Sequence, residues 1–184
     1  MTTPPPPMPR KDRLRRVVLL CTAFARNLAY YRVGQEEEHR DLFDPKKNES
    51  ANFWRVANSN CVDMCVLEWC KLFGDDKGKH YWANVVTDPA TFKRDLLAHL
   101  GLVDADFQDC ISEMRHYRDK FLAHLDSDRT MNIPKLDIPK KAVWFYHAHI
   151  VKHEAGKDDL AGLAVELDAG YEQSQKEAKA VFEK

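Results

Sequence analysis

Apolar residues recur along this chain at three- and four-residue steps, which is the period of an amphipathic α-helix. The first such segment begins near Asp12 and ends at Gly34, where the acidic run Glu36–Glu38 follows. Its apolar positions are Leu14, Val17, Val18, Cys21, Ala25, Leu28 and Tyr31. The pattern predicts one long helix that buries a single stripe.

The second helical segment, about residues 51–73, is apolar almost all round, and Ser50 is a candidate N-cap. One stripe is Phe53, Ala57, Cys61, Met64 and Leu67, and the other is Val62, Val66, Trp69 and Phe73. A helix with two apolar faces is expected at the centre of a bundle or at a subunit interface.

Four further helices are predicted at about residues 89–100, 104–125, 140–154 and 160–181. Asp88 and Pro89 open the first of them, Gly101 closes it, and Pro134 and Pro139 predict a loop before the third. No stretch alternates with period two. The sequence therefore predicts an all-α, up-and-down helical bundle of about six helices.

The length of 184 residues suits one domain, which we assign to residues 10–184. Residues 1–9, with four consecutive prolines at Pro4–Pro7, are predicted to be a disordered tail. The formal net charge of −1 excludes a general electrostatic attraction to nucleic acid, so RNA binding needs a local basic patch. The densest basic cluster includes Arg13, Arg15 and Arg16, which fits either a phosphate-contacting arm or a solvated helix start.

The longest apolar run, residues 17–25, is about half a membrane span, and no signal peptide is evident. We therefore expect no membrane association and a cytoplasmic location. Five cysteines suggest reduced thiols. Cys61, Cys65 and Cys70 lack the C-x2-C spacing of structural zinc sites and are expected in the core. His149 and His153 share a helix face, but without an accompanying carboxylate at the H-E-x-x-H spacing we assign no metal site.

Candidate chemistry centres on Arg118, Asp119 and His124. An Arg that holds a phosphate and a His that moves a proton near neutral pH suffice to cleave RNA without metal. Spacing alone is not specific, because the pairs Arg32/His39 and Arg94/His99 are similarly separated. The Arg94/His99 pair even repeats the acid after the Arg, but its helix is short, so we interpret it as a surface pair.

Structural explanations compete with this chemistry. His124 continues an apolar stripe, so it can be a packed residue, and Arg118 can simply pair with Glu113 or Asp119. Six residues along an ideal helix place two side chains roughly 120° apart. A shared site therefore needs a helix that ends or bends near His124, or residues from a second subunit.

The string from Arg118 to His124 resembles the R-x(4–6)-H motif of the HEPN (higher eukaryotes and prokaryotes nucleotide-binding) superfamily, in its AbiU-type abortive-infection branch. The helix that carries Trp54 and Trp69 and the loop at residues 133–136 support this resemblance, which covers about residues 13–154. It implies an all-helical domain, usually a homodimer in which two motifs meet across the interface.

Many members of that superfamily are metal-independent endoribonucleases of defence or toxin–antitoxin systems. Carried over, the resemblance implies that Arg118 and His124 are the catalytic pair, that Asp119 positions Arg118, and that no cofactor is needed. Its implied partners are RNA, a second copy and an antitoxin protein. The Tyr that follows the His in members modified by a nucleotidyltransferase antitoxin is absent, since Leu125 and Asp126 follow. The alternative is a non-catalytic module of the same fold that binds a protein or a nucleotide.

Overall fold

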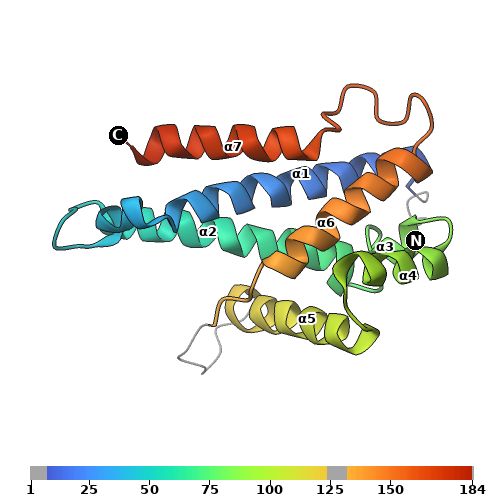
Figure 1. The fold of residues 1–184 in the computed structure, drawn as a ribbon, viewed down its shortest axis with the longest axis horizontal. Helices are drawn as coiled ribbons and strands as arrows, with labels where there is room; N and C mark the ends of the chain where they lie inside the picture. The colour runs from blue at the N-terminus through green and yellow to red at the C-terminus, as the bar shows by residue number, and fades with distance from the viewer. Residues whose placement is uncertain (1–7, 124–131, 184) are drawn as a thin grey trace, which may run out of the picture.

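The computed structural model describes residues 8–123 and 132–183, with the backbone alone for residues 121–123, and within these ranges the chain is helical and contains no strand (Figure 1). The elements are α1 (Arg10–Gly34), η1 (Glu37–Phe43), α2 (Ala51–Trp69), η2 (Cys70–Gly74), α3 (Trp82–Val85), α4 (Pro89–Leu100), α5 (Asp104–Tyr117), η3 (Arg118–Ala123), α6 (Asp137–His149), η4 (Ile150–Glu154) and α7 (Leu167–Phe182). The predicted all-α bundle is confirmed, and its long helices are the predicted ones.

Helix α1 is the centre of the bundle. It lies between α2 and α7, and α6 crosses it (Figure 1). Its predicted stripe is buried from Leu14 to Leu28, whereas Tyr31 is only half-buried. Burial on several sides joins α1 to one continuous apolar core that includes residues of α2, α4, α5, α6 and α7.

The two apolar stripes of α2 differ in burial. Val62, Val66 and Trp69 are fully buried against the core. The other stripe stays partly open to solvent, and Phe53 at its start is 65% exposed. The sequence predicted α2 at the centre of the bundle or at a subunit interface. In the described chain α1 is the central helix, and α2 packs against it with one face and leaves the other as exposed apolar surface. The subunit interface stays a prediction.

Several predicted helix ends are confirmed. The Asp88 carboxylate accepts a hydrogen bond from the Thr91 backbone N–H, and Gly101 closes α4 with a left-handed φ of 67°. Ser50 is at the N-cap position of α2, as predicted, but its side chain makes no capping hydrogen bond. Ser50 has φ −89° and ψ 10° instead of the extended backbone of an N-cap, and its N–H donates to the Asn48 side chain.

Two further expectations need correction. Pro139 lies in the first turn of α6 and not in a loop, because a proline there lacks only an N–H that the helix does not use. The last helix begins at Leu167 and not near Leu160. Gly162 adopts a left-handed φ of 79°, so Leu160 and Leu163 reach the core from turns.

Two predictions remain open in this structure. Residues 1–7 of the proline-rich tail lie outside the described residues, so their predicted disorder stays a prediction.

None of the described helices is both long enough and apolar enough to span a membrane. The cytoplasmic location also stays a prediction.

A pair of glycines tests the packing of α1. A Cβ on Gly34 would lie 2.3 Å from Asn58 Oδ1 and 3.0 Å from Phe182 Cζ, whereas a Cβ on Gly170 meets nothing within 4 Å. Overpacking costs about 1–3 kcal/mol, and replacing a helical glycine by alanine gains about 0.5–1 kcal/mol. We expect Gly34→Ala to lower the free energy of unfolding by about 1–2 kcal/mol and Gly170→Ala to raise it by about 0.5–1 kcal/mol in urea denaturation. Equal signs for the two variants would contradict this packing.

Candidate functional site

Arg118 begins the π-helical turn η3, where regular α5 ends. Its side chain is only 18% exposed. Nε donates to Asp119 Oδ1 at 2.8 Å, and Nη1 donates to Asp75 Oδ1 at 2.5 Å. Nη2 makes no hydrogen bond with any described residue. The guanidinium is therefore held in place by two carboxylates and keeps donors for a third partner.

The charges around Arg118 work in two directions. The hydrogen bond to Asp119 raises the pKa of the guanidinium, partial burial opposes that rise, and the bond to Asp75 adds to it. Arg118 therefore stays charged at any physiological pH. Because Asp75 already accepts a hydrogen bond from the guanidinium, a phosphate would have to compete with Asp75 for Arg118.

Tyr117 and Cys70, which lie near Arg118, both keep their protons at neutral pH. Tyr117 donates its hydroxyl proton to Asp63 Oδ1 at 2.7 Å, and burial followed by this hydrogen bond raises the pKa of Tyr117. Burial likewise raises the pKa of the Cys70 thiol to about 12. Neither side chain ionises near neutral pH, so the proton transfer of a reaction here would need another group.

His124 lies outside the described residues, so its distance from Arg118 is not tested. The backbone before it leaves regular α-helical geometry at Arg118 and continues as a π turn to Ala123, so an end or a bend of the helix at His124 stays a prediction. The π turn is not itself a mark of function, since within the described residues α2 and α6 also continue into π turns, η2 and η4.

The other two Arg/His pairs show what is particular to Arg118. Arg94 also donates to the acid that follows it, at 2.8 Å, but its side chain is 72% exposed. Arg32 pairs with Asp137 across the bundle, while His39 is buried near the start of η1. Among these three arginines, Arg118 alone combines the local acid with a second carboxylate from another element.

Most of the predicted basic arm contacts the protein itself. Arg13 donates to the Asn84 carbonyl, and Arg15 donates to the Asp159 and Ala161 carbonyls. Arg16 has an exposed side chain. The role of these residues in RNA binding stays a prediction, and Arg16 is the one of the three whose exposure suits it best.

The histidines of α6 and η4 differ in exposure and in their contacts. His147 is buried, and burial lowers its pKa. His149 Nε2 lies 3.1 Å from Glu154 Oε1, which also accepts from the Thr87 N–H, and His153 is exposed. The cysteines, all within the described part of the chain, are free thiols, and Cys61, Cys65 and Cys70 are buried or half-buried as predicted.

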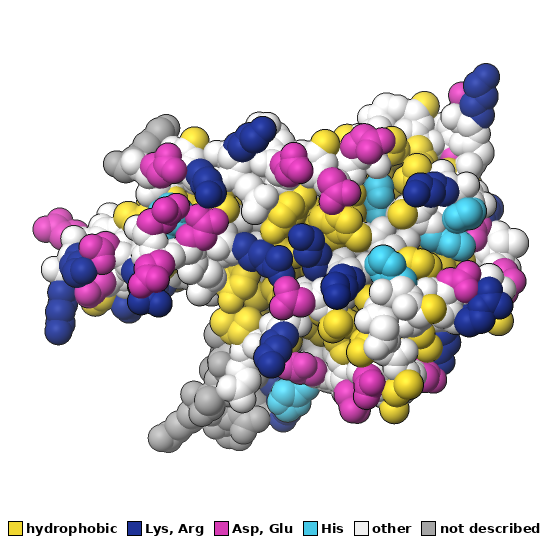
Figure 2. Space-filling model, viewed as in Figure 1, with side chains coloured by type: hydrophobic (Ala, Val, Ile, Leu, Met, Phe, Trp, Pro, Cys, Tyr) yellow, Lys and Arg dark blue, Asp and Glu magenta, His cyan; other side chains and the backbone are white. Residues whose placement is uncertain are grey.

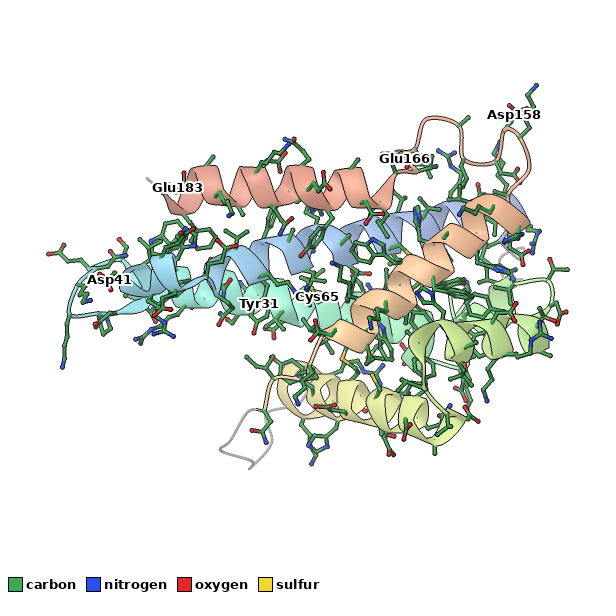
Figure 3. All side chains as sticks on the ribbon, in the orientation of Figure 1. Tyr31, Asp41, Cys65, Asp158, Glu166 and Glu183 are labelled. Atoms are coloured by element: carbon green, nitrogen blue, oxygen red, sulfur yellow. The ribbon has the colours of Figure 1, made fainter. Side chains whose placement is uncertain are left out.

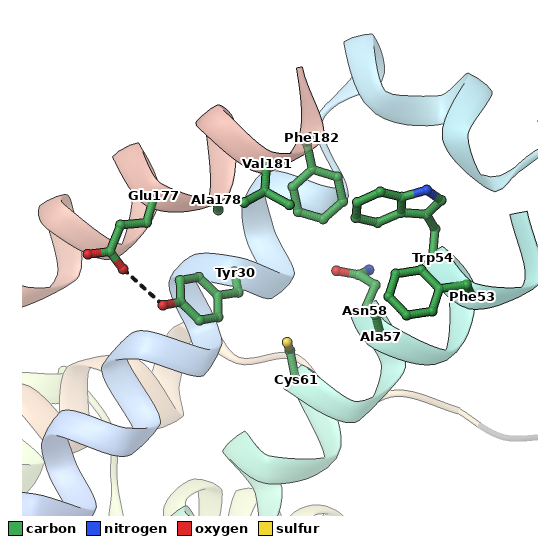
Figure 4. Close-up of a pocket in the computed structure, with 10 residues that line it drawn as sticks. All are labelled: Tyr30, Phe53, Trp54, Ala57, Asn58, Cys61, Glu177, Ala178, Val181 and Phe182. Atoms are coloured by element: carbon green, nitrogen blue, oxygen red, sulfur yellow. Dashed lines mark hydrogen bonds between the residues drawn. The ribbon is translucent and has the colours of Figure 1, made fainter. Parts of the chain in front are cut away.

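An apolar groove of about 360 Å³ lies between α1, α2 and α7, away from Arg118 (Figure 4). Its floor and walls include Phe53 and Trp54 of α2, and Val181 and Phe182 of α7. Tyr30 of α1 donates to Glu177 at its edge. On the α2 side the groove is lined by Phe53, Ala57 and Cys61, which belong to the outer apolar stripe of that helix.

Asp75 is the residue of this site that sequence reasoning missed. It is separated from Arg118 by 43 positions, and neither its spacing nor its neighbours distinguish it from other turn-forming acids. Only the crossing of η2 and α5 brings the two together.

Comparison of the chain with protein-family models, with curated proteins and with solved structures finds no match. Functional inference therefore rests on the residues and their geometry.

A double-mutant cycle tests whether Asp75 holds Arg118. The half-buried pair Arg118/Asp75 should show a coupling energy of about 1 kcal/mol in urea denaturation. The exposed pair Arg94/Asp95 is the matched control and should show at most about 0.3–0.5 kcal/mol. Equal coupling in the two pairs would show that the contact of Arg118 with Asp75 is incidental.

Proposed function

We propose that this chain is a metal-independent endoribonuclease of the HEPN type, or an RNase-like protein, in a phage-defence or toxin–antitoxin system. The observation that supports it best is the state of Arg118. Its guanidinium is charged, largely withdrawn from solvent, oriented by Asp119, and located six residues before His124, where the helix loses α-geometry. An oriented, partly desolvated guanidinium is suited to a phosphate whose charge grows in the transition state.

The proposed reaction needs no group beyond the chain and water. His124 accepts the proton of a ribose 2′-hydroxyl as the 2′-oxygen attacks the adjacent phosphorus. Arg118 stabilises the negative phosphorane with its guanidinium, and Asp119 keeps the guanidinium oriented. The bond from phosphorus to the 5′-oxygen breaks, and that oxygen takes a proton from water. The hydroxide that remains takes the proton that His124 accepted, which restores both the water and the neutral His124. The products are a 2′,3′-cyclic phosphate and a free 5′-hydroxyl.

RNA binding would depend on local charge, because the net charge is only −1. Lys and Arg side chains gather near the middle of the face drawn in Figure 2, with acidic side chains around them. Arg16 adds an exposed cation on α1. Such a surface supports contacts with a few phosphates and a salt-dependent affinity.

We also propose that the chain acts as a homodimer. The outer face of α2 exposes Phe53, Val56 and Met64, and Val181 of α7 is exposed beside the groove. The same helix carries Asp63, which accepts the Tyr117 hydroxyl next to Arg118. Pairing along α2 would bury the exposed apolar strip and bring two copies of the motif toward each other.

A non-catalytic module is the second candidate, and one observation favours it. Arg118 already has two carboxylate partners, so its geometry is also that of a structural ion pair. In that case the chain would bind a protein, such as an antitoxin, or a nucleotide, and Arg118 would stabilise the crossing of η2 and η3.

Substitution of the motif tests the catalytic proposal. Arg118→Ala and His124→Ala should each lower RNA cleavage by at least about 100-fold while helix content stays close to wild type. The double variant should be no worse than either single one, since residues that act as one catalytic unit are non-additive. Cleavage should persist in EDTA and leave cyclic-phosphate ends.

Arg94→Ala and His99→Ala are the matched controls, because they share the spacing and the following acid. They should leave cleavage intact. If His124→Ala unfolds the protein and wild type cleaves no RNA, the non-catalytic proposal stands instead.

The dimer proposal has its own test by analytical sedimentation at micromolar concentration. Phe53→Lys should weaken self-association by at least about 10-fold, since it places a charge in the exposed strip of α2. Val103→Lys is the control, because Val103 is 64% exposed but belongs to the loop before α5. A wild-type monomer, or equal effects of the two variants, would contradict pairing along α2.

A further inference from the structure

Glu36, Glu38 and His39 form a compact group at the junction of α1 and η1, independent of the proposed function. One carboxylate oxygen from each glutamate and one ring nitrogen of His39 all lie within 4.8 Å of one another. The group occupies the end of the molecule where η1 meets the C-terminal end of α7. Figure 3 places Asp41 of η1 and Glu183 at this same end.

His39 distinguishes this group from an ordinary acidic patch. Its side chain is only 4% exposed, and its Nδ1 lies 2.8 Å from the Val33 carbonyl. Because a carbonyl can only accept, Nδ1 carries the proton and Nε2 presents a lone pair. Nε2 is buried, has no hydrogen-bond partner among the described residues, and lies 3.9 Å from Glu38 Oε1.

This arrangement is the one that a metal-ligating histidine usually has. Such a histidine donates its other ring N–H to a backbone carbonyl or a carboxylate, which fixes the tautomer and the direction of the ring. Contact with the Phe182 ring, at 5.1 Å between centroids, further limits the motion of His39. The imidazole is therefore oriented before any ion binds.

We propose that Glu36, Glu38 and His39 bind one divalent transition-metal ion, with Zn²⁺ as the best fit. One imidazole nitrogen and two carboxylate oxygens are ligands that Zn²⁺ accepts, and a water can complete four-coordination. The imidazole disfavours Mg²⁺ and Ca²⁺, which prefer oxygen ligands alone.

The three ligand atoms, which lie within 4.8 Å of one another, must move closer together to bind an ion. Ligand atoms around a tetrahedral zinc ion stand roughly 3.4 Å apart, compared with 3.9 Å between Glu38 Oε1 and His39 Nε2. Glu38 is an exposed side chain and can move by this amount. Glu36 pairs with Lys179 through Oε2 at 3.3 Å, so its other oxygen can face the ion while the ion pair remains.

The ion would link three elements. Glu36 follows α1, Glu38 and His39 belong to η1, and Lys179 and Phe182 tie the same residues to α7. The expected role is structural: the ion fastens η1 and the end of α7 to the central helix, and it takes no part in the proposed RNA cleavage.

Two measurements on the whole chain test this site. Titration calorimetry with ZnCl2 under reducing conditions measures zinc binding, and thermal melting measures the stabilisation that zinc gives. Wild type should bind one equivalent at micromolar affinity and melt roughly 3–6 °C higher in excess zinc. Glu38→Gln, at an exposed position, and His39→Asn, which keeps a donor near the Val33 carbonyl, should each weaken binding at least about 10-fold.

Glu37→Gln is the matched control, because Glu37 is an exposed neighbour that pairs with Arg40 and should leave zinc affinity unchanged. The proposal is overturned if wild type binds no zinc at micromolar concentration. It is equally overturned if Glu38→Gln binds zinc as wild type does, because the ion would then be held by other histidines or by cysteines.

Discussion

The burial of α1 among α2, α6 and α7 is the constraint on which the rest of this structure depends. The neighbours of a helix that is enclosed on several sides must approach it closely, and α2 does so where Gly34 faces Asn58. The segments packed around α1 also determine what the arginines at the start of this helix bind. Arg10 binds Glu154, and Arg13 and Arg15 reach the carbonyls of surrounding loops. Cations that a sequence pattern assigns to solvent thus hold the connections between helices together.

Desolvation separates Arg118 from the other motif-like arginines. Arg94 and Arg118 make the same 2.8 Å bond to the acid that follows them, but only Arg118 is withdrawn from water and meets a second carboxylate. A half-buried charge gains more from a partner than an exposed one, and it costs more when the partner is lost. An incoming phosphate would therefore have to take the place of the Asp75 carboxylate and bring its own negative charge to the Arg118 guanidinium. That exchange favours a dianionic transition state over a singly charged diester, which is the direction that catalysis requires.

The sequence predicted what depends on local periodicity and failed where tertiary contacts decide. The stripe of α1 and the cap at Asp88 were correct because helix burial and first-turn hydrogen bonds are set by nearby residues. Ser50 is at the predicted N-cap position but its side chain makes no cap, because the Asn48 turn holds its backbone outside the extended region. Of the candidate site, the contact between Arg118 and Asp119 follows from adjacency, whereas Asp75 could not be predicted. Asp75 follows η2 and its partner Arg118 begins η3, 43 positions later, and no helical period relates residues so far apart.

The exposed strip of α2 makes the two proposed functions competitors. Phe53 borders the groove against α7, and Asp63 on the same helix binds Tyr117 beside Arg118. A second copy that covers this strip would complete a shared site and bury the groove. A partner protein seated in the groove would occupy the same apolar surface, so it would exclude the second copy. If both proposals hold, this surface is the dimer contact of the proposed RNase and also the place where the proposed antitoxin would prevent that contact.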